Sequence, residues 1–205
     1  MKLKFVLVSC FLLIFLNFFA QKTSFQKFKQ LSFPEKRWVI WHPFVAKKAY
    51  LVSIETRKIT NQIRKDSVLV GSGNGQQVDA FRHTYWMALL TNEIGWRRAR
   101  KLGVAHEKGN YRDFKKRKNE DGVIPDKISS EMDLYNNSVG IKIAKTSQKT
   151  DYMQLIITAI KNGECKIIKA DKKGNYLDCD GVIILNESLN GKWENNKCLV
   201  ASDLI

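Results

Sequence analysis

An acid–histidine pair is the first feature of the sequence that could carry chemistry. Asp79 and His83 are four residues apart, so on a helix they lie on one face. Trp86 and Leu90 continue that face, which indicates that it is buried. A carboxylate four residues before a histidine can orient the imidazole and raise its basicity, as a general base requires. The alternative is a local surface pair, worth about 0.2–0.5 kcal/mol.

A second pair, His106 and Glu107, stands shortly before Gly109 and a charged stretch. At the end of a helix beside a mobile loop, the two side chains would suit an acid–base or metal-ligand role. A histidine in a last helical turn can also simply interact favourably with the helix dipole. The sequence leaves both interpretations open.

A polar stripe follows further along the chain. Asp133, Asn136, Asn137 and Gly140 are spaced i, i+3, i+4 and i+7, as residues on one helical face are. Burial without partners would cost roughly 1–3 kcal/mol per polar group, so the stripe must meet partners, water or a ligand. For Asp133 there is an alternative, because Ser130 three residues earlier gives the pattern of a capping box. Gly140 would permit close approach of another helix or of a substrate.

These groups on three helices suit one inward-facing site. Two histidines with carboxylates would suit zinc or a similar divalent metal, and oxygen donors alone would suit calcium. Neither a His-Glu-x-x-His motif nor a Gly-x-Ser-x-Gly elbow is present. The predicted roles are catalytic for His83, Asp79, His106 and Glu107, substrate-binding for Arg82, Asn136 and Asn137, and metal-binding for Asp133.

The elements that must position these residues are mainly helices. Pro43 suits the first turn of a helix, and apolar spacing and glycine stops predict helices over about 44–65, 76–93, 96–108, 130–145 and 151–161. Residues 21–43 and 109–128 are expected to be irregular, with a solvated basic loop at 112–118. The predicted fold is therefore mainly α: a compact helical domain of about five helices over 21–163, with a small β-hairpin appendage over 164–205.

The appendage is expected to contain strands 166–169 and 176–178 around a turn at 171–175. A turn centred on Lys172 would place Cys165 opposite Cys179, which predicts a disulfide between them. Cys198 is the rival partner for either cysteine.

The start of the chain resembles an export signal. Lys2 and Lys4 precede an apolar run from Phe5 to Phe19, which is too short to span a bilayer comfortably. We expect a signal peptide over residues 1–20 with cleavage after Ala20, an uncleaved anchor being the alternative. The protein is then periplasmic or extracellular, and its mature chain has no transmembrane span.

The net charge of +15 would fall to +13 on loss of the signal peptide. Such a surface favours anionic envelope components such as phospholipid or cell-wall polymer. Simple solubility is the other explanation. Nucleic acid is an unlikely partner, because no nucleic-acid-binding motif accompanies the basic residues.

Three segments, taken together, resemble a bacterial domain-of-unknown-function family of secreted proteins of flavobacterial type. They are Asp79-Ala-Phe-Arg-His83, His106-Glu107 and Met132-Asp-Leu-Tyr-Asn-Asn-Ser-Val-Gly140. The pattern is Asp-x-x-Arg-His … His-Glu … Met-Asp-x-x-Asn-Asn-x-x-Gly. The resemblance implies that these polar residues belong to the family pattern, and it brings no established reaction.

Three functions remain open at this point. The first is a hydrolase acting on an envelope component, with His83 as general base. The second is a non-catalytic envelope-binding or interaction module, in which the same residues form a buried structural network. The third and weakest is a toxin-like effector acting on nucleic acid.

Overall fold

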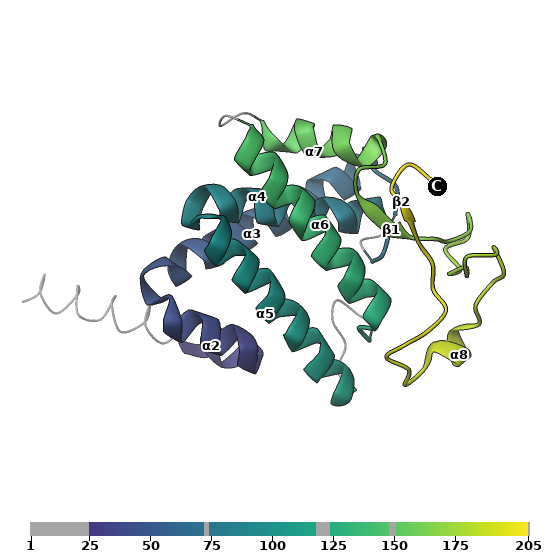
Figure 1. The fold of residues 1–205 in the computed structure, drawn as a ribbon, viewed down its shortest axis with the longest axis horizontal. Coiled ribbons are helices and arrows are strands. Elements are labelled where there is room, and N and C mark those ends of the chain that lie inside the picture. The colour runs from purple at the N-terminus through teal and green to yellow at the C-terminus, as the bar shows by residue number, and fades with distance from the viewer. Residues whose placement is uncertain (1–24, 72–73, 118–123, 148–150, 205) are drawn as a thin grey trace, which may run out of the picture.

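The structure is a computed structural model that describes residues 25–71, 74–117, 124–147 and 151–204. It is mainly helical, with a small two-stranded sheet near the C-terminus, which confirms the predicted fold class (Figure 1). The expected signal peptide at 1–20 lies outside the described residues. No helix in the described part of the chain is long and apolar enough to cross a membrane.

Three of the predicted helices are present almost as expected. They are α3 (Pro43–Lys65), α4 (Gln77–Ile94) and α7 (Tyr152–Lys161). Gly95 ends α4 with a φ of 83°, a conformation that only glycine adopts readily. Pro43 occupies the first turn of α3, where the missing N–H costs nothing.

The segment expected to be irregular before Pro43 is helical instead. Residues 25–30 are helical, and α2 (Phe33–Trp41) follows after a short break. Ser32 caps α2 because its side chain accepts from the Glu35 N–H while the Glu35 carboxylate accepts from the Ser32 N–H. This capping box, with Pro34 next to it, is a helix-start signal that the apolar pattern alone does not reveal.

The prediction that a helix ends before Gly109 is wrong. Helix α5 (Trp96–Lys115) continues through this residue and through the start of the predicted basic loop. A Cβ on Gly109 would lie only 2.5 Å from Ser32 Oγ, so the glycine serves the contact between α2 and α5. His106 and Glu107 therefore lie inside a helix and not in its last turn.

Helix α6 (Lys127–Thr146) begins three residues earlier than predicted. Its N-cap is Asp126, whose side chain accepts from the Ser129 N–H. The capping-box interpretation of Ser130 and Asp133 is therefore wrong, and Asp133 lies inside the helix, where its burial needs another explanation. Gly140 lets α6 approach α4 closely, because a Cβ there would lie 2.1 Å from the Thr84 carbonyl oxygen.

Helix α4 is the centre of the molecule. It contacts α3, α5, α6 and α7, and its side chains are buried on nearly every face. Phe81 and Ala88 belong to a cluster completed by α7 and β1, whereas Met87 and Leu90 belong to another completed by α2, α3 and α5. The buried polar residues of α4, Asp79 and His83 among them, therefore lie on the helix that links the two hydrophobic clusters.

The C-terminal appendage contains β1 (Lys166–Ile168), α8 (Asn186–Leu189) and β2 (Leu199–Ala201). The predicted turn forms, with the Asp171 carboxylate accepting from the N–H groups of Lys173 and Asn175. The predicted partner strand is wrong, because β1 pairs antiparallel with β2. Beyond an isolated bridge between Ala170 and Tyr176, the chain turns away from β1.

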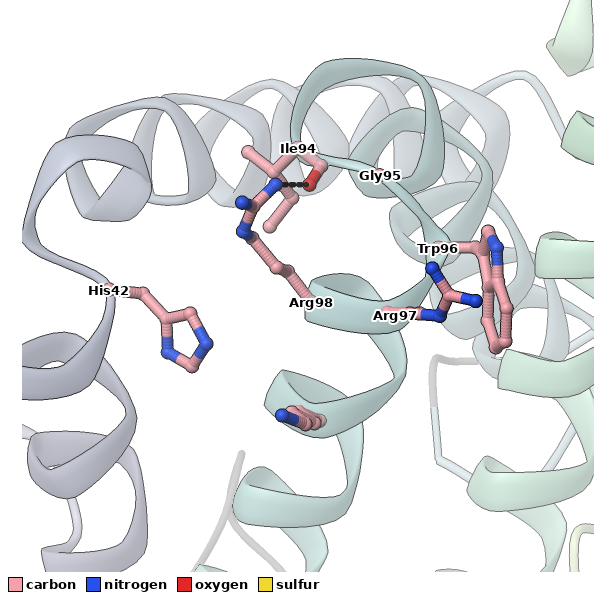
Figure 2. Close-up of a pocket in the computed structure, with 7 residues that line it drawn as sticks. His42, Ile94, Gly95, Trp96, Arg97 and Arg98 are labelled. Atoms are coloured by element: carbon pink, nitrogen blue, oxygen red, sulfur yellow. Dashed lines mark hydrogen bonds between the residues drawn. The ribbon is translucent and has the colours of Figure 1, made fainter.

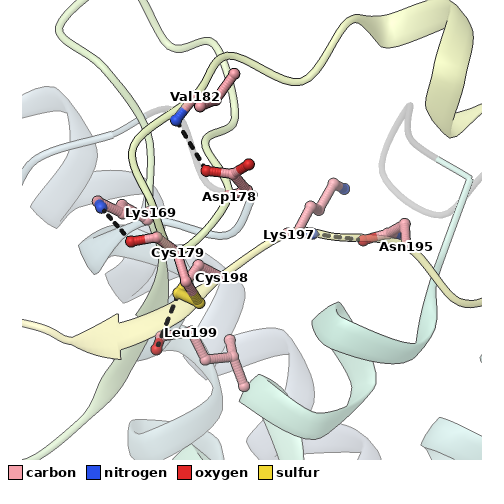
Figure 3. Close-up of a disulfide and its surroundings, with 8 residues drawn as sticks. All are labelled: Lys169, Asp178, Cys179, Val182, Asn195, Lys197, Cys198 and Leu199. Carbon is pink, nitrogen blue, oxygen red and sulfur yellow. Dashed lines mark hydrogen bonds between the residues drawn. A yellow bond between two sulfur atoms is a disulfide. The ribbon is translucent and has the colours of Figure 1, made fainter.

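The different strand pairing also changes the disulfide. Cys179 is bonded to Cys198, with Cα atoms 5.0 Å apart, and the bond fastens the chain after the turn to the start of β2 (Figure 3). The predicted Cys165–Cys179 bond is wrong, and the rival partner Cys198 is the actual one. Cys165 is a buried free thiol beside the Thr84 hydroxyl, and burial raises its pKa to about 11.

Candidate functional site

Three of the predicted residues meet where α4 crosses α6. His83 Nε2 lies 3.6 Å from Asp79 Oδ1 and 3.3 Å from Asp133 Oδ1. All three side chains are buried, and His83 is only 3% exposed. One ligand-capable atom from each residue lies within 4.8 Å of the other two. The i, i+4 spacing on α4 and the position of Asp133 on α6 together make this cluster.

Arg82 covers the cluster from its more exposed side. Its Nη2 lies 2.7 Å from Asp79 Oδ1 and 3.3 Å from His83 Nε2. The other oxygen of Asp79 accepts from the Gly75 N–H at 2.7 Å, which fixes the carboxylate to the loop before α4. The Arg82 side chain is 24% exposed, whereas that of Asp79 is 7% exposed.

The environment of His83 favours the neutral imidazole. Burial lowers the pKa of His83 well below its usual value, and the positive charges of Arg82 and His106 lower it further. The side chain of Asn137 faces the ring and opposes this fall. A neutral imidazole keeps a lone pair on one ring nitrogen, which is the form that binds metal ions.

Two of the three distances between the donor atoms match the geometry of a metal centre, and the third is below 4.8 Å. Zinc binds nitrogen and oxygen ligands at about 2.0–2.2 Å, which places neighbouring ligands of a tetrahedron about 3.3–3.6 Å apart. The two distances from His83 Nε2 to the carboxylate oxygens, 3.3 and 3.6 Å, fall in this range. The residues Asp79, His83 and Asp133 could therefore hold one divalent cation and leave a position for water. We call them the cation cluster.

His106 lies next to the cation cluster, on α5. Its ring centroid is 6.4 Å from that of His83, and its Nδ1 lies 3.1 Å from Glu35 Oε1. The His106 ring also packs against Trp86 at a steep angle, with ring centroids 5.6 Å apart. A carboxylate on one imidazole nitrogen orients the ring and raises its basicity, which suits a residue that transfers protons. With its side chain 25% exposed, His106 is more accessible than His83.

Glu35 is the site residue that the sequence interpretation missed. Burial alone would raise the pKa of Glu35, but the hydrogen bond and charge of His106 and the hydrogen bonds from Ser32 lower it below its usual value. Glu35 is therefore a carboxylate at neutral pH. The capping box at Ser32 could have predicted a helix here, and hence an ordered Glu35 carboxylate. It could not have predicted that this carboxylate contacts His106, which is 71 residues away in the sequence.

The remaining predicted residues have different surroundings. Glu107 is buried on α5 and accepts from the Asn110 amide at 3.1 Å. Asn136 donates to the Lys166 carbonyl and accepts from the Lys166 N–H, so its amide joins α6 to β1. Asn137 lies between His83 and Gly103, where a Cβ would come within 3.0 Å of its amide nitrogen.

A buried ion pair joins the C-terminal segment to the residue that caps α6. Lys197 forms a buried ion pair with Asp126 at 2.7 Å, and its ammonium lies over the Tyr176 ring. Burial raises the pKa of Tyr176, and the charges of Asp126 and Asp79 raise it further. The disulfide between Cys179 and Cys198 joins the residue next to Lys197 to the chain after the turn at 171–175.

Comparison with known proteins identifies the family to which this chain belongs. No curated protein and no solved structure matches the chain. The model of the family described as domain of unknown function (DUF6973) matches residues 36–165, which include the cation cluster and His106. The match covers more than half of the chain, from α2 to the residue before β1, and the protein therefore belongs to this family of domains of unknown function.

Proposed function

We propose that the protein is a metal-dependent hydrolase whose centre is a divalent cation bound by Asp79, His83 and Asp133. The observation that carries the proposal is the spacing of the three buried donor atoms, with 3.3 and 3.6 Å between His83 Nε2 and the carboxylate oxygens. Two carboxylates and a neutral imidazole suit zinc or a similar ion. Three protein ligands leave room for the water molecule that a hydrolase activates.

The neighbouring residues supply the other parts of a hydrolytic site. A bound divalent cation lowers the pKa of its water towards 7. His106, oriented by Glu35, would take or return a proton. Arg82 would move away from Asp79 towards solvent when the cation binds, and there meet an anionic group of the substrate. The proposed substrate is an anionic envelope component, either phospholipid or cell-wall polymer.

A structural network is the alternative, and one observation favours it. The guanidinium of Arg82 contacts both Asp79 Oδ1 and His83 Nε2, so it already supplies a positive charge near the position that a cation would take. In this account the buried polar groups satisfy one another and fix the packing of α4 and α6. The protein would then bind an envelope component through its basic surface, without catalysis.

We also propose that the protein is exported, as a member of a group of secreted bacterial proteins of flavobacterial type. The disulfide between Cys179 and Cys198 supports export, because disulfides persist in oxidising compartments. The proposed family pattern is Asp-x-x-Arg-His, His-Glu and Met-Asp-x-x-Asn-Asn-x-x-Gly. Its supporting observation is that Asp79, His83 and Asp133 from these segments lie together.

The proton-transfer role of His106 gives the first prediction. His106→Gln should lower kcat by roughly 10²–10⁴-fold, because general acid–base catalysis contributes about this much. Glu35→Gln should lower kcat by roughly 10–100-fold, because it removes only the group that orients the ring. Both variants should keep the parent's cation stoichiometry, since neither side chain belongs to the cation cluster.

The measurement begins with a screen of the purified protein with Zn²⁺, Mn²⁺ or Ca²⁺ against phosphatidylglycerol vesicles and peptidoglycan. The variants are then compared under the condition that gives turnover, with Asp113→Asn on the same helix as the matched control. Loss of cation binding in His106→Gln would place this histidine among the ligands. Full activity in His106→Gln would contradict its role in proton transfer.

A further inference from the structure

A second charged site lies about 22 Å along α4 from the cation cluster, where this helix turns into α5. A cavity of about 350 Å³ is lined there by residues from the turn, from the first turns of α5 and by His42 at the junction of α2 and α3 (Figure 2). Three of its lining residues are the cations Arg97, Arg98 and Lys101, and none is acidic. The cavity therefore suits an anionic group.

Local contacts hold two of the three cations, and in the described part of the chain no acidic side chain forms an ion pair with Arg97, Arg98 or Lys101. Arg98 donates to the Ile94 carbonyl at 3.1 Å, and the guanidinium of Arg97 lies over the Trp96 ring, 5.0 Å from its centre. Figure 2 shows His42 projecting towards the same space from the opposite side. The His42 ring stacks on Trp38, and its Nδ1 contacts the Trp38 carbonyl at 2.8 Å, so this wall of the cavity is ordered.

Three large apolar side chains close to His42 in the sequence are exposed to water. Trp41 and Phe44 flank His42 in the sequence and are 74% and 95% exposed, and Ile40 is exposed as well. Exposed apolar groups gathered next to cations are typical of a surface that meets a partner. The partner must be anionic where it enters the cavity and apolar beside it.

We propose that this corner attaches the protein to an anionic lipid bilayer. The phosphate of a phospholipid headgroup would enter the cavity, and Trp41 and Phe44 would enter the boundary between headgroups and acyl chains. The charge of +15 adds a general attraction to such a surface. A nucleic acid fits less well, because Ile40 offers it neither a charge nor a face for stacking. The proposal does not depend on the cation cluster.

The test measures partitioning of the purified chain onto vesicles of phosphatidylglycerol and phosphatidylcholine, with pure phosphatidylcholine vesicles as the neutral comparison. Arg97→Gln with Lys101→Gln should weaken binding to the anionic vesicles roughly 30-fold, the effect of removing two interfacial cations. Lys172→Gln with Lys173→Gln makes the same change of charge in the exposed turn of the appendage, at the other end of the molecule (Figure 1), and should have little effect.

Brominated lipids identify the residues that enter the bilayer, because bromine quenches tryptophan emission at close range. The first 24 residues contain no tryptophan, so quenching cannot come from the apolar N-terminal segment. Trp41→Ser should remove most of the quenching, and thermal melting should show that this variant is folded.

Equal losses in the two double variants would overturn the proposal in favour of general charge attraction. Equal binding to neutral vesicles, or unchanged quenching in Trp41→Ser, would overturn it as well. A third result would assign the corner to nucleic acid instead. The chain would then bind a single-stranded oligonucleotide but not the vesicles, and Arg97→Gln with Lys101→Gln would weaken the oligonucleotide binding.

Discussion

Asp133→Asn is expected to abolish cation binding and the activity that depends on it. Asparagine keeps the size of the side chain but removes the negative charge that would bind the ion. Loss of a group that merely orients a ligand lowers metal affinity by about 10–100-fold, so loss of a direct ligand should exceed 100-fold. Asp66→Asn removes an exposed carboxylate at the end of α3 and should leave cation binding unchanged.

The stability of this variant separates the cation site from a structural network. Without a cation, Asp133→Asn should be as stable as the parent or more stable, because it removes one of two neighbouring buried carboxylates. A structural network would instead lose roughly 1–3 kcal/mol when the charge that His83 meets is removed. His83→Ala provides the second comparison, and the network account predicts the larger loss there as well. Thermal melting with and without cation distinguishes the two accounts.

Lys197→Met should have the largest effect on stability. It removes one member of a buried ion pair, whose side chains are 4% and 6% exposed, and leaves Asp126 buried without a cationic partner. Breaking such a pair costs about 3–5 kcal/mol. For a chain of this size the melting temperature should fall by roughly 6–20 °C.

The neighbouring exposed pair provides the matched control. Lys127 and Glu194 join the same two segments at 3.1 Å, but both side chains face solvent, so Lys127→Met should change stability little. Lys197→Met combined with Asp126→Asn should recover part of the loss, because no buried charge remains unpaired. An equal effect of Lys127→Met and Lys197→Met would contradict the assignment of the buried pair.

The same pair predicts a pH dependence. Burial alone would raise the pKa of Asp126, but the charge and hydrogen bond of Lys197 and the hydrogen bonds from Ser129 lower it. The unfolded chain therefore takes up this proton at a higher pH, near 3.9, than the folded protein does. The stabilisation is complete above about pH 4 and is lost as the pH falls through the lowered folded value. The difference in the free energy of unfolding between the parent and Lys197→Met combined with Asp126→Asn should shrink over that pH range.

Local sequence signals predicted much of the fold. Gly95 and Pro43 marked helix ends correctly because each has a conformational property that acts locally. Gly109 led to a wrong prediction of a helix end, because a glycine can also allow two helices to pack closely. The contact with Ser32 that requires it here cannot be seen in the sequence spacing. The disulfide was missed for a related reason, since β1 pairs with a strand 33 residues later along the chain.

The candidate site shows the same limit. The i, i+4 spacing of Asp79 and His83 and the buried polar stripe at Asp133 predicted residues that now lie together. The spacing could not reveal that Asn136 is engaged by the β1 backbone, because this contact depends on tertiary packing. Glu35 was missed because it lies in a segment that was predicted to be irregular, and its contact with His106 depends on the helix that forms there.

The central claim is that Asp79, His83 and Asp133 bind one divalent cation. Calorimetric titration of the metal-free protein with Zn²⁺, and then with Mn²⁺ and Ca²⁺, tests it most directly. The account predicts one ion per chain for at least one of these metals, retention in Asp66→Asn and loss in Asp133→Asn. At a free concentration 100 times the Kd, the ion should stabilise the parent by about 2.7 kcal/mol. The claim would be contradicted if none of the three metals binds, or if Asp133→Asn binds the ion as well as the parent does.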